Sequence, residues 1–451
     1  MNSQQTAARY YRVLRKYLNQ NPVFFEPFET GKFIDLCKKQ YLLVIVPLVV
    51  CLVILGCNLT ASKTPTPIPA TETPIQISTQ VPTPIPSPSA TPIPSPTATP
   101  IPYSSFEETN RFNISNDLND RLVAAEMSPD GKLIAFSSIN IANVKDFKFS
   151  YKLTVVKSDS GEVVYTFNLD QINPNFLSSH HFLAFSPDGQ WLVSAVEYNQ
   201  TSPISLPQFV VQLWNLADGK LSKTVKVRDL NGLTFSPYGK LLGAPGIGGP
   251  SYLLDAHSLD IKALLETTYS WGFAFHPSSP QFAAASSADT AIHVIDIASK
   301  KEVEQFAGNL PHVNVIAYSP DGSLLAFSGY SGADYYSSTV KPGDYSILVW
   351  DVNANALKTS FPLTGYTGIV KSLAFSPDGT RLATLGAGQP FINGGEKFPE
   401  DKFVRIWNVA SGSKIKDINM DGGIASLSFN SDWTTMITGG WDGLIIVWEV
   451  K

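Results

Sequence analysis

At 451 residues the chain could hold two or three average domains or one large repeat domain. It contains 43% hydrophobic and 16% charged residues with a formal net charge of −5, a composition typical of a folded globular protein. Residues 1–40 carry seven basic and three acidic side chains, so the remainder is more acidic than the whole. Because an acidic body repels phosphate groups, nucleic acid is excluded as the expected partner.

The segment 41–59 predicts a membrane-spanning helix. It begins with sixteen consecutive uncharged residues, Tyr41 to Gly56, and reaches a spanning length when it is extended to Leu59. Positive charge stays on the cytoplasmic side of a membrane. The sequence therefore predicts a cytoplasmic basic leader over 1–40, one N-terminal hydrophobic helix over 41–59 that serves as a signal anchor, and an extracytoplasmic remainder.

A second interpretation of this segment stays open. The motif Ile54–Cys57 (ILGC) resembles the lipobox of bacterial lipoproteins, where the signal peptide is removed and a lipid is attached to the cysteine, here Cys57. Leu55 is not a preferred residue before the glycine, and a charged leader of 40 residues is long for a signal peptide. Both interpretations tether the protein to the cell membrane.

Residues 60–104 form a spacer rich in proline and threonine. Proline lacks an amide donor and restricts the residue before it, so this tract can form neither helix nor sheet. We expect a disordered, extended polyproline II spacer that reaches on the order of 100 Å, at about 3.1 Å per residue. Similar spacers separate anchors from outer domains in bacterial envelope proteins, and the composition is also that of glycosylated stalks. The cysteines Cys37, Cys51 and Cys57 all precede the predicted folded part, which therefore contains no disulfide.

From residue 105 onward one hairpin unit recurs. Its best copy alternates apolar and polar residues over Val370–Phe375, turns at Ser376–Gly379, and continues into Leu382–Leu385, with a third strand at Phe403–Trp407 and a fourth over Ser413–Asn419. Proline at the second turn position and glycine at the fourth suit a type I turn. The equivalent turns, 40 to 58 residues apart, are Ser128–Gly131, Ser186–Gly189, Ser236–Gly239, His276–Ser279, Ser319–Gly322, Ser376–Gly379 and a degenerate copy at Asn430–Asp432.

Each turn is followed by a third-strand motif. The seven motifs are Leu153–Val156, Val211–Asn215, Tyr252–Asp255, His293–Asp296, Leu348–Asp351, Arg405–Asn408 and Ile446–Glu449. Residues 105–451 thereby resemble the WD-repeat family, although among the seven motifs only Trp350-Asp351 is the full dipeptide. The resemblance implies an all-β fold, a seven-bladed β-propeller of four-stranded antiparallel blades.

The last unit predicts how the ring closes. It ends after its third strand and lacks a fourth, whereas a spare strand over 110–115 precedes the first unit. We expect strand 110–115 to pair with strand 444–449 and complete the seventh blade, because this removes an open sheet edge.

The family's Gly-His step before the turn is missing from every unit. Asp289, Asp401 and Asp442 stand near the expected turn before the third strand. Without the histidine, apolar packing and the turn bonds of these aspartates are expected to replace the buried network.

No catalytic, cofactor-binding or metal-binding site is predicted. The chain has six histidines, and the adjacent pair His180-His181 would point to opposite faces of a strand. Nucleophile elbows, phosphate-binding loops and Cys-x-x-Cys motifs are absent from the sequence. The repeated turn aspartates serve local bonds to the backbone rather than catalysis.

Four long loops between second and third strands carry the predicted binding surface. They span 139–150, 197–208, 330–345 and 386–402 and share one rim of a propeller. Aromatic residues with a few polar ones suit a protein or glycan partner, although the rings could instead pack the loops internally. The candidate residues in the last two loops are Tyr330, Asp334, Tyr335, Tyr336, Tyr345, Phe391, Glu396 and Phe398.

The sequence thus predicts a non-catalytic interaction or scaffold module, a monomeric propeller displayed outside the cell membrane, which binds its partner through rim loops. The alternative is a sensor or enzyme that binds a small ligand in the central channel. The first strands of the seven units, which would line that channel, read as nearly all apolar. That pattern favours the scaffold.

Overall fold

The computed structural model describes residues 103, 105–117, 119–143, 148–169, 181–198, 208–246, 251–265, 272–285, 290–307, 310, 312–330, 345–362, 370–386, 392–393, 396–397, 402–420 and 423–451. The predicted leader, hydrophobic segment and spacer up to residue 102 lie outside these residues. Among the described residues, no helix is both long enough and apolar enough to cross a membrane.

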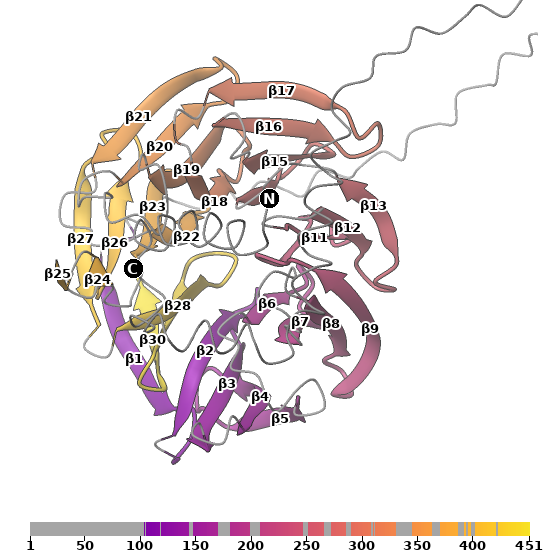
Figure 1. The fold of residues 1–451 in the computed structure, drawn as a ribbon. Helices are drawn as coiled ribbons and strands as arrows, with labels where there is room; N and C mark the ends of the chain where they lie inside the picture. Colours follow the sequence, from indigo (N-terminus) through magenta and orange to yellow (C-terminus); the bar gives the residue numbers. More distant parts are fainter. Residues whose placement is uncertain are drawn as a thin grey trace, which may run out of the picture. The chain divides into compact units, whose positions relative to one another are not determined.

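Seven four-stranded antiparallel sheets, the blades, follow one another along the chain (Figure 1). The first three blades are β2 (Asp120–Met127), β3 (Leu133–Asn143), β4 (Lys148–Lys157) and β5 (Val163–Asn168); β6 (His181–Phe185), β7 (Trp191–Tyr198), β8 (Gln208–Asn215) and β9 (Lys220–Arg228); β10 (Thr234–Phe235), β11 (Leu241–Ala244), β12 (Ser251–Asp255) and β13 (Ile261–Leu265).

The next three blades are β14 (Phe273–Phe275), β15 (Gln281–Ala285), β16 (Ala291–Asp296) and β17 (Glu302–Ala307); β18 (His312–Tyr318), β19 (Leu324–Tyr330), β20 (Tyr345–Asp351) and β21 (Ala356–Pro362); β22 (Val370–Phe375), β23 (Arg381–Gly386), β26 (Phe403–Asn408) and β27 (Lys414–Asn419). The seventh blade joins β28 (Ile424–Phe429), β29 (Thr435–Gly440) and β30 (Leu444–Val450) to β1 (Phe106–Asn113). A separate two-stranded hairpin, β24 (Ile392–Asn393) with β25 (Glu396–Lys397), lies between β23 and β26.

The predicted turns form as the residue types require. In the sixth blade the Ser376 hydroxyl donates to Asp378 Oδ1 over 2.6 Å and accepts from the Arg381 backbone N–H over 2.9 Å. Gly379 closes the turn at a φ of +70°, which a residue with a Cβ adopts only with strain. The same serine–aspartate pair recurs in three other blades, at Ser128, Ser186 and Ser319.

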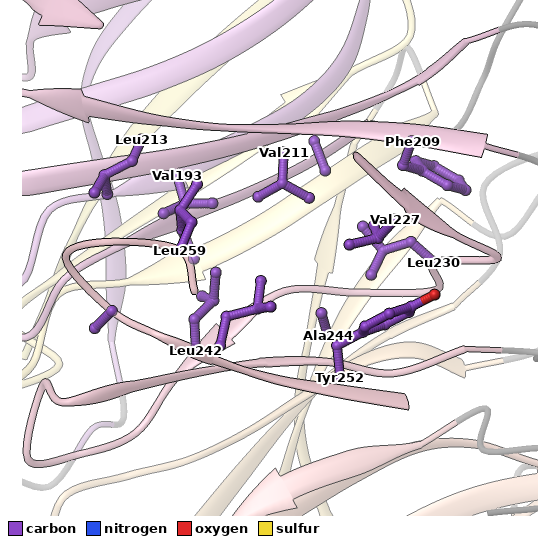
Figure 2. Close-up of a cluster of buried hydrophobic side chains, with 14 of the residues drawn as sticks. Val193, Phe209, Val211, Leu213, Val227, Leu230, Leu242, Ala244, Tyr252 and Leu259 are labelled. Carbon is purple, nitrogen blue, oxygen red and sulfur yellow. The ribbon is translucent and has the colours of Figure 1, made fainter. Parts of the chain in front are cut away.

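The hydrophobic core consists of seven clusters, one between each pair of neighbouring blades. Figure 2 shows the cluster between the second and third blades, in which Val211 and Leu213 of β8 face Leu242 of β11 and Tyr252 of β12. Each blade is therefore covered on both faces by its neighbours. Both faces of every blade are therefore buried only when the ring is complete.

The predicted ring closure is confirmed. β1 pairs antiparallel with β30 from Phe106 opposite Val450 to Asn113 opposite Leu444, and Ser105 and Lys451 exchange two backbone bonds of 3.0 Å. The strand begins four residues before the predicted range 110–115, because Phe106 is also drawn into the core between the sixth and seventh blades. Asn110 Nδ2 in addition donates to the backbone oxygen of Asp159 over 3.0 Å, which ties β1 to the first blade.

Apolar packing and turn bonds were expected to replace the buried polar network of the blades. In three blades this prediction is wrong. The indole N–H of Trp214 donates to Ser194, that of Trp407 to Thr384 and that of Trp448 to Thr438, over 2.9 to 3.0 Å. A hydroxyl on the second strand thus satisfies each tryptophan where a histidine is missing. Of the three turn aspartates, Asp442 accepts from the Leu444 backbone N–H over 3.1 Å, and the other two lie outside the described residues.

Deletion of residues 105–118 should lower the melting temperature of the propeller by roughly 10 °C or more. The deletion opens the edge of β30 and removes Phe106 from the core, and a large buried aromatic side chain alone contributes about 3 kcal/mol or more. Differential scanning calorimetry of the full chain measures the shift. A deletion of equal length within the spacer, residues 80–93, is the control and should leave the melting temperature unchanged. A closing-strand deletion that melts like this control would contradict the role of β1.

Candidate functional site

The ring has two different faces because all seven blades repeat one antiparallel topology. The turns between first and second strands and between third and fourth strands lie on one face, which we name the turn face. The loops between second and third strands, together with the connections between blades, lie on the other, which we name the loop face. The first strand of each blade is innermost and borders the central channel, whereas β5, β9, β13, β17 and β21 lie at the periphery (Figure 1).

Each inner strand has an equivalent position two residues before the first residue of its turn. At this position the first blade differs from the other six. Six blades have small side chains at this position, namely Ala184, Thr234, Ala274, Ala317, Ala374 and Ser428. Small residues are expected where seven strands converge on an axis, because little volume is left for side chains. The first blade instead has Glu126.

Glu126 reaches from the first blade to the seventh. Its neighbours Ala125 and Met127 are buried against the seventh blade, and Glu126 itself is half-buried. Ser428 on β28 accepts a hydrogen bond from the Met127 backbone N–H over 3.1 Å and donates its own proton to the Glu126 carboxylate. The described residues provide no ion pair for this carboxylate.

The pKa of Glu126 is strongly perturbed. Burial raises the pKa of its carboxyl group to about 8, and the hydrogen bond from Ser428 offsets only part of this rise. The charged form is disfavoured because burial removes the carboxyl group from water. A carboxyl group with such a pKa is mostly protonated at neutral pH.

A cavity of about 420 Å³ lies beside Glu126, at the turn-face end of the channel. The fifth, sixth and seventh blades supply its other walls. Its apolar lining is Pro320, Leu373, Ala374, Phe375, Pro377, Leu427, Phe429 and Trp433, and its polar lining is Glu126, Ser372, Ser428, Asn430 and Ser431. Glu126 is the ionisable side chain of this lining.

The degenerate turn of the seventh blade forms one wall of the cavity. Trp433 stands where five other blades have glycine, and its φ of +61° is unfavourable for a bulky residue. The ring is only 3% exposed and stacks on Phe429 with centroids 4.0 Å apart, so packing holds the strained backbone. Ser431 donates from both its backbone N–H and its hydroxyl to the Pro129 oxygen, each over 2.9 Å. This wall is thus fastened to the first blade.

Three of the predicted binding residues belong to the described part of the chain, at the second-to-third-strand loops of the fifth and sixth blades. Tyr330 ends β19 and Tyr345 begins β20, where the two residues pair directly at the base of the fifth-blade loop. Glu396 lies on β25, in the small hairpin within the loop of the sixth blade. Asp334, Tyr335, Tyr336, Phe391 and Phe398 lie outside the described residues, as does the candidate lipid-attachment residue Cys57.

The loop face also has a cavity, of about 630 Å³, at the junction of the seventh and first blades. Asp117, Asp120, Arg121 and Asp442 line it together with Trp441. Asn140 Nδ2 donates to Asp117 and Asp120 over 2.8 and 2.7 Å, and Asp442 accepts the turn bond from Leu444, so local bonds engage these carboxylates. They are structural in this arrangement.

Two of the described histidines, His181 and His276, serve packing and local bonds. His181 is buried beside the Tyr151 ring, with centroids 5.0 Å apart, and His276 Nδ1 accepts turn bonds from Ser278 and Ser279. Within the described ranges, no group of three or more metal-ligating side chains gathers. His180 lies outside those ranges.

The prediction that the inner strands are nearly all apolar overlooks Glu126, the most unusual residue of the channel. The first strand of the first blade, Leu122–Met127, includes this glutamate. The signal was present in the repeats: when the seven units are aligned on their turns, this column has one charged residue among small ones. The approach of Ser428 to Glu126 could not be read from the sequence, because these residues lie 302 positions apart.

Comparison with known proteins supports a WD-repeat β-propeller. Residues 357–408 and 415–449 match the model of the WD domain, G-beta repeat. Over 40% of its length the chain is 27% identical to small ribosomal subunit protein RACK1y of Oryza sativa subsp. japonica, of which 46% is covered. Over 35% of its length it is 28% identical to the uncharacterized WD repeat-containing protein sll1491 of Synechocystis, of which 38% is covered. The match to transducin beta-like protein 3 of Rattus norvegicus has 27% identity over 30% of the chain and covers 14% of that protein. The chain thus spans less than half the length of these relatives.

Replacement of Glu126 by glutamine should change the pH dependence of stability. Because the folded-state pKa is about 8 and the ordinary value 4.5, the wild-type protein retains a proton that the unfolded chain releases, so its stability falls as pH rises between these values. The upper limit of this loss is about 5 kcal/mol. Glu126→Gln removes it, so its stability advantage over the wild type should grow from pH 5 to pH 8.5 in urea unfolding.

The exposed, surface-paired Glu162 supplies the control. Glu162→Gln should differ from the wild type by a nearly constant amount across the same pH range, since exposed ion pairs contribute little. A difference between Glu126→Gln and the wild type that does not grow with pH would contradict the burial of this carboxyl group.

Proposed function

We propose that this protein is a non-catalytic interaction scaffold whose propeller stands outside the cell membrane and binds a protein partner through the loop face. The observation that carries the proposal is the pair of long insertions in adjacent blades, 331–344 in the fifth and 387–402 in the sixth. The equivalent connection in the seventh blade needs only residues 441–443. The fold therefore does not require the insertions, and their residues are available for recognition.

The composition of the insertions suits a protein surface. Tyr335, Tyr336 and Phe391 occur within them, and Tyr330 and Tyr345 stand opposite each other at the base of the first. Aromatic side chains provide large contact areas at low cost in conformational entropy and are enriched at the centres of interfaces. Asp334 and Glu396 add hydrogen-bond acceptors to the same loops. A glycan could use the same stacking surfaces, so it is the alternative outcome of the test.

A catalytic role has less support. The described part of the chain has no cluster of metal-ligating residues, and the carboxylates beside the loop-face cavity are engaged in local bonds. Repeat proteins of this type present broad surfaces to other molecules.

The fifth-blade loop can be tested without a change in strand register. Because Tyr330 pairs with Tyr345, replacement of residues 331–344 by Asn-Gly should close the hairpin with a tight turn. In crosslinking and pull-down from intact cells, we expect this variant to lose a protein that the wild type captures. Glycosidase treatment of the captured material distinguishes binding to protein from binding to glycan.

The second blade offers a matched control on the same face. Tyr198 pairs with Gln208, so residues 199–207 can be replaced by Asn-Gly in the same way. This control should retain the partner, because it lacks the predicted binding residues. An identical set of captured proteins from the wild type and the fifth-blade variant would contradict binding through the loop of the fifth blade.

We further propose that segment 41–59 tethers the protein as an uncleaved signal anchor, with 1–40 in the cytoplasm and the spacer 60–104 holding the propeller away from the membrane. The support is the uncharged segment and its basic leader. The lipoprotein alternative requires Cys57, so substitution of that residue separates the two modes.

Cys57→Ala should leave the protein in the membrane fraction with its size unchanged, because an anchor needs no lipid. Deletion of 41–59 should release it from that fraction. Carbonate extraction and immunoblotting measure both outcomes, and protease added to intact cells tests whether the propeller is outside. A Cys57→Ala protein that is larger than the wild type would support the lipoprotein instead, because the leader is then no longer removed.

A further inference from the structure

The cavity at the turn-face end of the channel has no role in the proposed loop-face binding. It combines one carboxyl group with apolar walls formed by Phe375, Phe429 and Leu427. Glu126 occupies a crowded position at which the other six blades have small residues. A small residue would avoid the cost of burying a carboxyl group there. A binding site explains why the carboxyl group is present.

We propose that this cavity binds a small organic cation, a guanidinium or ammonium group on an apolar body, with Glu126 as the counter-ion. Glu126 lines the cavity and has no ion-pair partner among the described residues. A charged donor placed beside it would supply the compensation that the protein itself omits. The apolar walls would pack the body of the ligand.

The polar residues of the cavity determine the direction from which a ligand can approach. Ser428 already donates to Glu126, so one side of the carboxylate is engaged within the wall. Ser431 donates its hydroxyl to Pro129, and Asn430 donates to Thr434 and accepts from the Thr435 backbone, so these groups hold the turn. Glu126 is the ionisable residue of this lining. A bound cation would therefore contact Glu126 as its principal anionic partner.

Three other carboxyl groups on the turn face have a lowered pKa. For Asp130, Asp321 and Asp378, burial raises the pKa, but hydrogen bonds from the turn serines and backbone outweigh it, so the pKa of each is lowered overall. Asp432 accepts bonds from Thr434. The nearby cations are engaged locally, Lys132 with Asp130 over 3.4 Å and Arg381 with the Thr380 oxygen over 3.2 Å. Burial lowers the pKa of Lys371 on β22, whose ammonium group lies over the Trp441 ring at 5.4 Å. Asp130, Asp321 and Asp378 stay ionised between pH 6 and 9, whereas Glu126 changes its charge in this range.

The test uses the full chain in detergent micelles and isothermal titration calorimetry with benzylguanidinium, which stays cationic throughout this range. Because the cation binds the ionised carboxylate, its affinity should rise on the order of 50- to 100-fold from pH 6 to pH 9. Benzylurea has the same shape without the charge, and its binding should be at least tenfold weaker at pH 9.

Variants assign the binding to Glu126. Glu126→Gln should weaken benzylguanidinium binding at least tenfold at pH 9 and remove its pH dependence. Glu126→Asp, which keeps the charge but shortens the side chain, should have an intermediate affinity. Glu304 on β17 is a matched control, because burial also raises its pKa but it lies outside the cavity, so Glu304→Gln should bind as the wild type does. Circular dichroism confirms that each variant is folded.

The source of the cation is resolved by a peptide. If Ala-Ala-Arg-Ala-Ala binds more tightly than benzylguanidinium, the cavity accepts a side chain of a polypeptide; weaker binding of the peptide indicates a free small molecule. Either result supports the site. The proposal would be overturned if Glu126→Gln and the wild type bound benzylguanidinium with equal affinity. It would also be overturned if the wild type bound benzylurea and benzylguanidinium equally, or showed no saturable binding of benzylguanidinium at pH 9.

Discussion

The pairing of β1 with β30 is the constraint on which the rest of the propeller depends. Each blade buries both faces against its neighbours, so every hydrophobic cluster needs the two blades that form it. An open ring would leave the cluster between the seventh and first blades exposed to water, together with an unpaired edge of β30. Because β1 and β30 come from opposite ends of the folded part, one strand fixes the circular order of all seven blades.

The same circular arrangement makes the channel position of Glu126 costly. Seven inner strands converge there, and six of them have a small side chain. A carboxyl group at this position loses water without gaining a cation from the described residues, which raises its pKa. A small residue at this position would avoid the desolvation cost of Glu126. Either the ring is stable enough to tolerate this cost, or a cation that occupies the cavity compensates it.

Much of the fold could be predicted from the sequence because short local patterns of residues determine its strands and turns. The Ser-Pro-Asp-Gly turns, the period-two strands and the missing fourth strand of the last unit are each visible within about 50 residues, and the closing strand follows from that omission. The seventh turn was recognised only as degenerate, because a buried tryptophan in a left-handed conformation follows from packing against Phe429 rather than from turn chemistry. The bonds of Trp214, Trp407 and Trp448 to second-strand hydroxyls were missed for a related reason. They depend on strand register, which fixes the side chains that meet across the sheet.

The closing junction and the channel cavity belong to one mechanical unit. The first and seventh blades meet at three distances from the axis: at the periphery through Asn110 of β1 and Asp159, in the middle through their shared hydrophobic cluster, and at the channel through the bonds of Ser428 to Met127 and Glu126. The turn residues Ser431 and Pro129 join the same two blades on the turn face. A ligand that ionises Glu126 would strengthen the bond from Ser428, because a charged acceptor binds a hydroxyl more strongly than a neutral one. Occupation of the cavity would therefore tighten the junction at which the ring closes, while the loops of the fifth and sixth blades, on the other face, could vary without any effect on it.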